Sequence, residues 1–173
     1  EAFNKDVTEY TVNVANAVTS LTVTPMLADS TATVAVNGGT SLVVGNNTIT
    51  VTVTAQNGIP KVYKITVTRG PSANADLSGI TLSTGSLTET FAANVTEYTM
   101  IVANAVTSLT VTPTVADSTA TVAVSGGASL VVGSNTITIT VTAQNGTPKV
   151  YKITVTRDPS SNANLSGITL STG

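Results

Sequence analysis

Residues 136–157 read TITITVTAQNGTPKVYKITVTR, and this stretch decides the fold class. On both sides of the central QNGTP, apolar residues alternate with threonine or lysine. Successive side chains of a β-strand point to opposite faces, so this period of two predicts two strands, each apolar on one face. The Asn145-Gly146 pair between them favours a tight turn with positive φ, and therefore a hairpin.

Most of the chain is present twice, including this hairpin. Residues 1–85 align without a gap with residues 89–173 at an offset of 88; 16 of the 85 positions differ, so 69 are identical. The period is too long for short solenoid motifs, in which one unit cannot bury its own apolar face. It therefore predicts two modules, each with a core of its own.

Five further runs in the complete copy have the residue types and alternation of short strands. Gly79 interrupts the alternation between Leu77 and Ile80, which predicts a β-bulge. Pro113 is expected to end its strand, because proline cannot donate to a ladder. The seven expected strands cover residues 77–83, 96–102, 107–113, 119–125, 129–132, 136–143 and 149–157. The sequence thus predicts an all-β fold of tandem antiparallel, immunoglobulin-like β-sandwiches of about seven strands each.

The same alternation predicts which side chains of the second module are buried. A register slip of one residue would exchange the two faces of a strand, so burial tests the assignment directly. The side chains expected in the core are Leu77, Ile80, Leu82, Tyr98, Leu109, Val111, Ile137, Ile139, Tyr151, Ile153 and Val155.

The two copies are out of phase with the ends of the chain. The segment 77–88 opens the second copy and has no counterpart before Glu1, while its first nine residues recur as residues 165–173. The expected parts are a first module lacking its opening strand (1–70), a linker (71–76), a complete second module (77–158), a linker (159–164) and the opening strand of a further module (165–173).

The composition argues against several functions. Charged residues make up 9% of the chain and the net charge is −2, so a basic stripe for nucleic acid is missing. Without cysteine or histidine, the usual ligands of zinc and haem and the usual bases of nucleophilic catalysis are absent. We therefore expect no enzyme activity, no catalytic or metal-binding residue, no cofactor, no nucleic-acid partner and no insertion into a membrane.

Several landmarks in the chain together resemble a known family. They are LSGITLSTGSL (77–87), Phe91, Tyr98, ITITVTAQNG (137–146) and VYKITVTR (150–157). Their order is similar to that of the cadherin-like β-sandwich module, found in tandem on bacterial surface proteins and secreted enzymes. The resemblance implies an immunoglobulin-like sandwich at an extracellular or cell-surface location, and it implies no ligand. The acidic calcium motifs of true cadherins are missing, which argues against calcium at the junctions.

Three functions are compatible with these features. The leading hypothesis is a non-catalytic structural module of a bacterial surface stalk, adhesin shaft or fibre. The alternatives are a carbohydrate- or host-surface-binding module and an accessory domain of a secreted enzyme. The expected partners are further copies joined head to tail or neighbouring modules of the same polypeptide, with contact to cell wall or polysaccharide as an additional expectation.

The repeated opening strand suggests how copies join. If that strand pairs beside the closing strand, as in the family, the first module has an open edge and an apolar slot. The acceptor residues are then Tyr63, Ile65 and Val67. The self-assembly strand carries Leu165, Ile168 and Leu170, which match Leu77, Ile80 and Leu82. Donation to the next copy would give a linear head-to-tail fibre. The alternative is that the ends reflect trimming of a longer array, in which residues 165–173 are the first strand of the next module.

Overall fold

The computed structural model describes residues 2–171 and divides into two compact parts, unit 1 (Glu1–Ala73) and unit 2 (Asn74–Gly173). The outermost residues of two expected parts, Glu1 of the first module and Thr172 and Gly173 of the last strand, lie outside the described residues. All regular elements in residues 2–171 are β-strands, so the predicted all-β fold class is confirmed.

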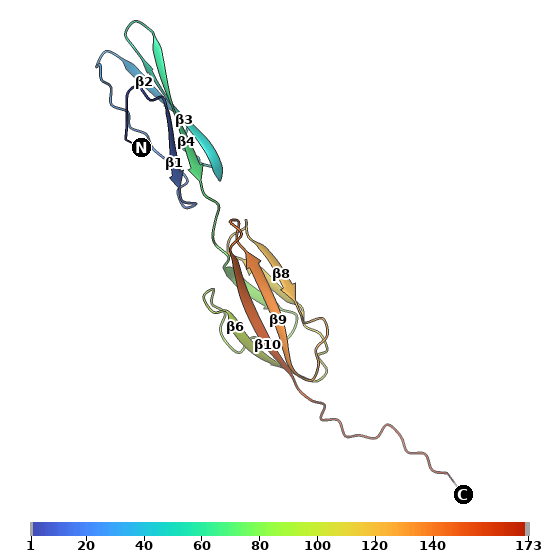
Figure 1. Cartoon of the computed structure of the whole chain (residues 1–173). Helices are drawn as coiled ribbons and strands as arrows, with labels where there is room; N and C mark the ends of the chain where they lie inside the picture. The colour runs from blue at the N-terminus through green and yellow to red at the C-terminus, as the bar shows by residue number, and fades with distance from the viewer. Residues whose placement is uncertain (1, 172–173) are drawn as a thin grey trace. The chain divides into compact units, whose positions relative to one another are not determined.

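Unit 2 is a sandwich of two sheets. Its strands are β5 (Leu77–Leu82), β6 (Glu97–Val102), β7 (Val111–Val115), β8 (Thr121–Ser125), β9 (Gly133–Thr142) and β10 (Pro148–Arg157). One sheet has the order β6-β10-β9-β8, and the strands β5 and β7 form the other (Figure 1). Apolar side chains from both sheets form one core, which holds the layers together.

The hairpin β9–β10 is built as its sequence predicts. The strands pair antiparallel with Ile137 opposite Ile153 and Ile139 opposite Tyr151, and all four side chains are fully buried. Gly146 in the turn has a φ of 87°, a conformation that side chains with a Cβ rarely adopt. Period-two alternation thus places the apolar face correctly.

Nine of the eleven side chains predicted to be buried in unit 2 are buried. The two exceptions, Ile80 and Leu82, are half-buried and pack against the same core. Both lie on β5, which pairs only with β7 and so lies at the margin of the sandwich. The predicted β-bulge is also confirmed, because the register of β5 against β7 shifts between Leu77 and Gly79.

Unit 1 contains one sheet, formed by β1 (Glu9–Val14), β2 (Thr33–Asn37), β3 (Gly45–Thr54) and β4 (Pro60–Arg69) in the order β1-β4-β3-β2 (Figure 1). Its core is centred on Leu42, Ile49 and Val67. Residues 23–27, the counterpart of β7, form no strand. Strand β7 is hydrogen-bonded only to β5 within its sheet, and the described part of unit 1 has no equivalent of β5.

The expected pairing of the opening strand is wrong. In unit 2 this strand, β5, pairs with β7, and β6 lies parallel to the closing strand β10. In unit 1, β1 occupies the same place beside β4, with Tyr10 opposite Ile65 and Val12 opposite Val67. The expected open edge at Tyr63, Ile65 and Val67 is therefore absent. Alternation identifies the face on which a side chain lies, and it does not identify the neighbouring strand.

Three details of the expected strands also differ. The two four-stranded sheets are mixed, because each contains a parallel pair, and the described strands number four in unit 1 and six in unit 2. Pro113 lies inside β7 opposite Ile80; an edge strand accommodates a residue that cannot donate. Residues 129–132 form no strand, and the loop places Leu130 in the core while its N–H donates to Thr107 O at 2.8 Å.

Candidate functional site

Unit 1 carries an apolar groove of about 650 Å³. The groove lies between the sheet and residues 23–28, and we call it the unit 1 groove. Side chains of three strands and of that segment line it, among them Tyr10, Val53, Tyr63, Ile65, Val23 and Leu27. A groove with mainly apolar walls suits an apolar occupant that excludes water.

The unit 1 groove corresponds to the space that β5 fills in unit 2. Leu27 and Val23 are the counterparts of Val115 and Val111, and in unit 2 these two lie opposite Leu77 and Leu82 of β5. The exposure of the walls differs between the two units. Tyr63 and Ile65 are partly exposed, whereas their counterparts Tyr151 and Ile153 are fully buried. The repeat within the chain thus shows what a filled groove looks like.

A tyrosine hydroxyl marks the end of the site where β5 begins. In unit 2 the Leu77 N–H donates to the Tyr151 hydroxyl at 3.1 Å, and that hydroxyl donates to Ala93 O at 2.9 Å. In unit 1 the Tyr63 hydroxyl makes the equivalent donation to Lys5 O at 3.1 Å. A hydroxyl both donates and accepts, so Tyr63 is oriented to receive an N–H from a strand in the groove.

An aromatic pair forms another part of the wall. Phe3 stacks on Tyr10 with ring centroids 6.1 Å apart, and in unit 2 Phe91 stacks on Tyr98 at 6.0 Å. Phe3 is 74% exposed, while Phe91 packs against the core. The two rings of the pair stack in the same way in both units, so the exposed ring of Phe3 belongs to the wall of the unit 1 groove.

A lysine lies beside the same end of the site in each unit. The ammonium of Lys149 is 2.7 Å from Asp76 Oδ1 and donates to Ala93 O at 2.7 Å. The hydrogen bond to Asp76 is the main cause that raises the pKa of Lys149. In unit 1, Lys61 donates to Lys5 O at 2.5 Å and lies 5.3 Å from the centre of the Tyr63 ring.

The residues of the expected self-assembly strand are exposed. Leu165, Ile168 and Leu170 are 76%, 74% and 89% exposed, whereas Leu77, the counterpart of Leu165, is 0% exposed. The part of the segment that the structure describes forms no strand. Of the expected acceptor residues, Tyr63 and Ile65 line the groove, and Val67 is buried in the core below.

Residues 23–27, the backbone that would pair with an added strand, were not predicted as a pairing site. The signal was present, since Leu21, Val23, Pro25 and Leu27 alternate with polar or exposed positions. Pro113, the counterpart of Pro25, was expected to end its strand, but it lies inside β7.

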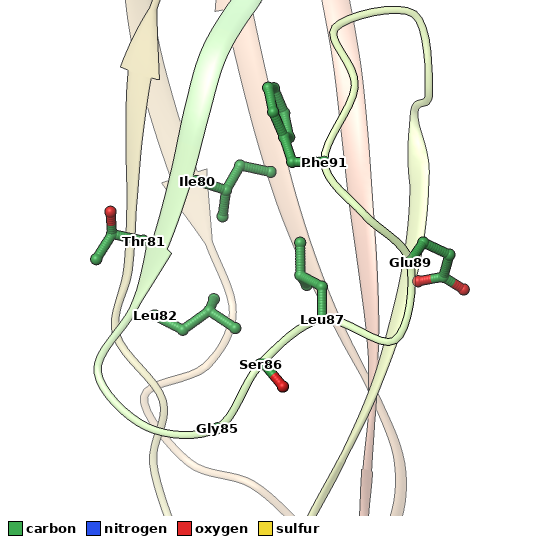
Figure 2. Close-up of a pocket in the computed structure, with 8 residues that line it drawn as sticks. All are labelled: Ile80, Thr81, Leu82, Gly85, Ser86, Leu87, Glu89 and Phe91. Atoms are coloured by element: carbon green, nitrogen blue, oxygen red, sulfur yellow. The ribbon is translucent and has the colours of Figure 1, made fainter.

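A second, more open cavity of about 370 Å³ lies beside β5 in unit 2. Figure 2 shows Ile80, Leu82 and Leu87 pointing into it, while the Glu89 carboxylate points away. That carboxylate accepts hydrogen bonds from the Thr99 N–H at 2.7 Å and the Thr99 hydroxyl at 2.8 Å, which lower the pKa of Glu89. The cavity therefore presents no free acid–base group.

Two further kinds of site are absent from residues 2–171. No group of three or more histidine, cysteine, aspartate or glutamate side chains is arranged to hold a metal ion. Within the same residues, no helix is long and apolar enough to cross a membrane.

Comparison with known proteins identifies the family. The model of the cadherin-like beta sandwich domain matches residues 1–70 and 77–158, and the chain belongs to this family. Domains of this kind are typically non-enzymatic and extracellular.

Individual relatives are more distant. A protein of Evansella cellulosilytica described as "Putative membrane protein" is 38% identical over 96 residues, which cover 50% of this chain and 14% of the relative. The solved structure "PcdhgB3 EC1-4 in 50 mM HEPES" has 11% identity and a TM-score of 0.33, and covers 91% of this chain and 50% of its own. The fibronectin(III)-like modules of CbhA from Clostridium thermocellum have 14% identity and a TM-score of 0.23. The match covers 95% of this chain and 98% of the CbhA chain.

Proposed function

We propose that the chain is a non-catalytic structural segment of an extracellular stalk, adhesin shaft or fibre, in which modules join head to tail. The observation that carries this proposal is the near-identity of the two copies, which differ at 16 of 85 aligned positions. Modules that do the same structural work tolerate duplication with little change. A pair of sites with separate ligands would favour differences concentrated at the two sites.

The ionised side chains of unit 2 support a structural role. Arg157 donates to two backbone carbonyls, Asn104 O at 2.9 Å and Leu130 O at 2.8 Å. Lys149 and Glu89 are likewise bound to groups of their own unit. These charges hold loops to strands, and hydrogen bonds to charged groups stabilise more than neutral ones. This arrangement favours a rigid module over a reactive centre.

Head-to-tail joining would follow from donation of residues 165–173 to the unit 1 groove of another copy. Burying Leu165, Ile168 and Leu170 would contribute roughly 5–8 kcal/mol before ordering costs, at about 1.5–3 kcal/mol per side chain. Because donor and acceptor are different surfaces, each copy can bind one neighbour through its donor and another through its acceptor, and such contacts can extend a line of copies. The apolar segment 165–170, which repeats the sequence of β5, and the apolar unit 1 groove support this arrangement.

A carbohydrate-binding function would use exposed aromatic rings. Phe3 and Tyr10 offer such rings in unit 1, but the same pair in unit 2, Phe91 and Tyr98, packs inside the module. The rings of Phe3 and Tyr10 are therefore explained as part of the wall of the unit 1 groove, and we favour the structural function over carbohydrate binding.

The mass of the chain in solution tests the proposal. The full chain should form concentration-dependent oligomers in sedimentation or light-scattering measurements. The chain without residues 165–173 should remain a monomer, because the donated strand is gone. If both chains are monomers at every concentration, head-to-tail joining by this strand is ruled out. If the monomeric chains instead bind an immobilised cell-wall polysaccharide, the binding function replaces the structural one.

A further inference from the structure

We propose that β8, an edge strand of unit 2, docks a second copy of this chain. The two β8 strands pair antiparallel with Ala123 opposite Ala123, so that the sheet of one copy continues into the sheet of the other. Two observations carry the proposal: β8 has the least protected edge among the strands described in unit 2, and its sequence is complementary to itself. The unit 1 groove and residues 165–173 take no part in this contact.

The other strand edges of unit 2 are protected. On β6, the Thr88 N–H donates to Thr99 O at 2.8 Å and the Thr99 N–H donates to a Glu89 carboxylate oxygen at 2.7 Å, so both backbone groups of Thr99 are occupied. Strand β7 contains Pro113, and proline is a common device against pairing at sheet edges. Strand β5 faces residues 85–91 across the cavity of Figure 2. Each of these features discourages the addition of a further strand.

Strand β8 has none of these devices. It lies at the end of the order β6-β10-β9-β8 and is hydrogen-bonded within its sheet only to β9 (Figure 1). All five of its residues are exposed. Val122 and Val124 lie opposite fully buried residues of β9 and therefore on the inner face of the sheet, but they remain 40% and 41% exposed. The edge thus offers a strand backbone together with apolar side chains.

The sequence of β8, TVAVS, is complementary to itself when two strands run antiparallel about Ala123. Val122 of one copy then lies opposite Val124 of the other on the inner face. Thr121 lies opposite Ser125 on the outer face. Pairs of β-branched side chains and pairs of hydroxyl side chains are both favourable across strands. Antiparallel pairing therefore suits both faces of the strand at once.

The charges near β8 favour a second copy and the antiparallel direction. Residues 118–148 contain no charged side chain, so this stretch offers no ion pair to an acidic or basic partner. The nearest charge before the strand in the sequence is Asp117. Parallel strands would place two Asp117 carboxylates side by side, whereas antiparallel strands place them at opposite ends of the contact. A neutral strand of the same chain is therefore the occupant that fits.

The same kind of edge recurs in unit 1. Strand β2 has the sequence TVAVN, ends the order β1-β4-β3-β2 and has all five residues exposed. Val34 and Val36 are 37% and 42% exposed, and residues 30–60 carry no charge. One pair of five-residue strands is a small contact and binds weakly, but edges repeated along two neighbouring chains act together. The contact therefore suits side-by-side association of chains.

Disulfide trapping detects a weak contact, and the chain has no cysteine of its own. An Ala123→Cys chain should form a disulfide-linked dimer under mild oxidation, since opposite Cα atoms lie about 4.5–5.5 Å apart and a disulfide spans that distance. The matched control is Thr121→Cys, which is also exposed on the same strand and face. In the proposed register two such residues lie about 13 Å apart along the strands. The control should react at least about tenfold more slowly.

Each outcome of the trapping has a definite meaning. Equal rates for Ala123→Cys and Thr121→Cys would overturn β8 as a docking strand, and a faster Thr121→Cys would overturn the antiparallel register. An Ala35→Cys chain should be trapped like Ala123→Cys, because β2 has the same edge; trapping of Ala35→Cys at the control rate would overturn the argument that an open, neutral edge is sufficient. Removing residues 165–173 should leave the rates unchanged, which separates this contact from head-to-tail joining.

A lysine on the strand tests whether the edge itself drives the reaction, since lysine discourages edge pairing. An Ala123→Cys chain that also carries Val124→Lys should be trapped at least about threefold more slowly, because both valine pairs of the contact are lost. The matched control is Val131→Lys, at a residue that is 63% exposed and lies outside the strand. It should leave the trapping rate unchanged. Equal slowing by both lysines would assign the effect to general charge repulsion and overturn the pairing of the strands.

The urea midpoint of unit 2 checks that Val124→Lys leaves the unit folded.

Discussion

Replacing Leu77 by alanine tests whether β5 is an integral part of unit 2. Leu77 is the first residue of β5, its side chain is 0% exposed, and it belongs to the core. Leucine-to-alanine changes at such sites remove apolar contacts and leave a cavity, at a cost of about 2–5 kcal/mol. We expect unit 2 to lose this much free energy of unfolding.

Urea unfolding followed through amide NMR signals of β9 and β3 reports each unit separately. With a slope of about 1–2 kcal/mol per molar urea, the midpoint of unit 2 should fall by roughly 1 M or more. The urea midpoint reported by the signals of β3 should not change, because unit 1 does not contain Leu77.

Leu165→Ala is the matched control, since Leu165 is followed by the same eight residues as Leu77 but is exposed. In a dilute monomeric sample this change should alter either unit by no more than about 0.5 kcal/mol. A loss below about 1 kcal/mol for Leu77→Ala, or equal losses in the two units, would refute the view that β5 completes the core.

Three further predictions concern single contacts. Tyr151→Phe should destabilise unit 2 by about 1–3 kcal/mol, because the Leu77 N–H and the Ala93 carbonyl both lose a hydrogen-bond partner. Tyr63→Phe should destabilise unit 1 by less, because only the Lys5 carbonyl loses one. The urea midpoints of the two variants measure both losses, and equal losses would contradict the reasoning. Gly127→Ala should cost at least about 1–3 kcal/mol in thermal unfolding, because its φ is 83° and a Cβ would lie 2.4 Å from a backbone oxygen; an unchanged melting temperature would disprove this. Hydrogen bonds from Thr99 lower the pKa of Glu89 below 4.5, so its contribution is complete above that pH and is lost as pH falls through the folded-state pKa. Glu89→Gln should therefore flatten the loss of unit 2 stability between about pH 5 and 3, and an unchanged acid limb would be inconsistent with this role.

Local patterns predicted those features that depend on one strand alone. Ile137 and Ile139 lie on the buried face because alternation and pleat have the same period. The bulge between Leu77 and Gly79 was predicted because it disturbs that period locally. The hairpin at Gly146 was predicted from the chemistry of its turn.

Features that depend on two distant strands were not predictable in the same way. Whether β10 is flanked by β5 or β6 depends on how loops cross the ends of the sandwich, and side-chain alternation is silent on this point. The predicted position of the groove was wrong for the same reason, since it assumed that the opening strand lies beside the closing strand. Its apolar walls were predicted at Tyr63 and Ile65, but its pairing backbone at residues 23–27 was not, because a proline inside an edge strand resembles a proline that ends one.

The parallel pairing of β6 with β10 has a consequence under tension. Their six residue pairs run from Glu97 opposite Lys152 to Val102 opposite Arg157, so the start of β6 and the end of β10 leave the ladder in opposite directions. A force that pulls these two ends apart acts along the strands and loads all their hydrogen bonds together, in shear. An antiparallel hairpin pulled at its two open ends would instead unzip one bond at a time. We therefore expect unit 2, when it is held at the start of β6 and the end of β10, to rupture in single-molecule pulling at one high force, with no staircase of small steps.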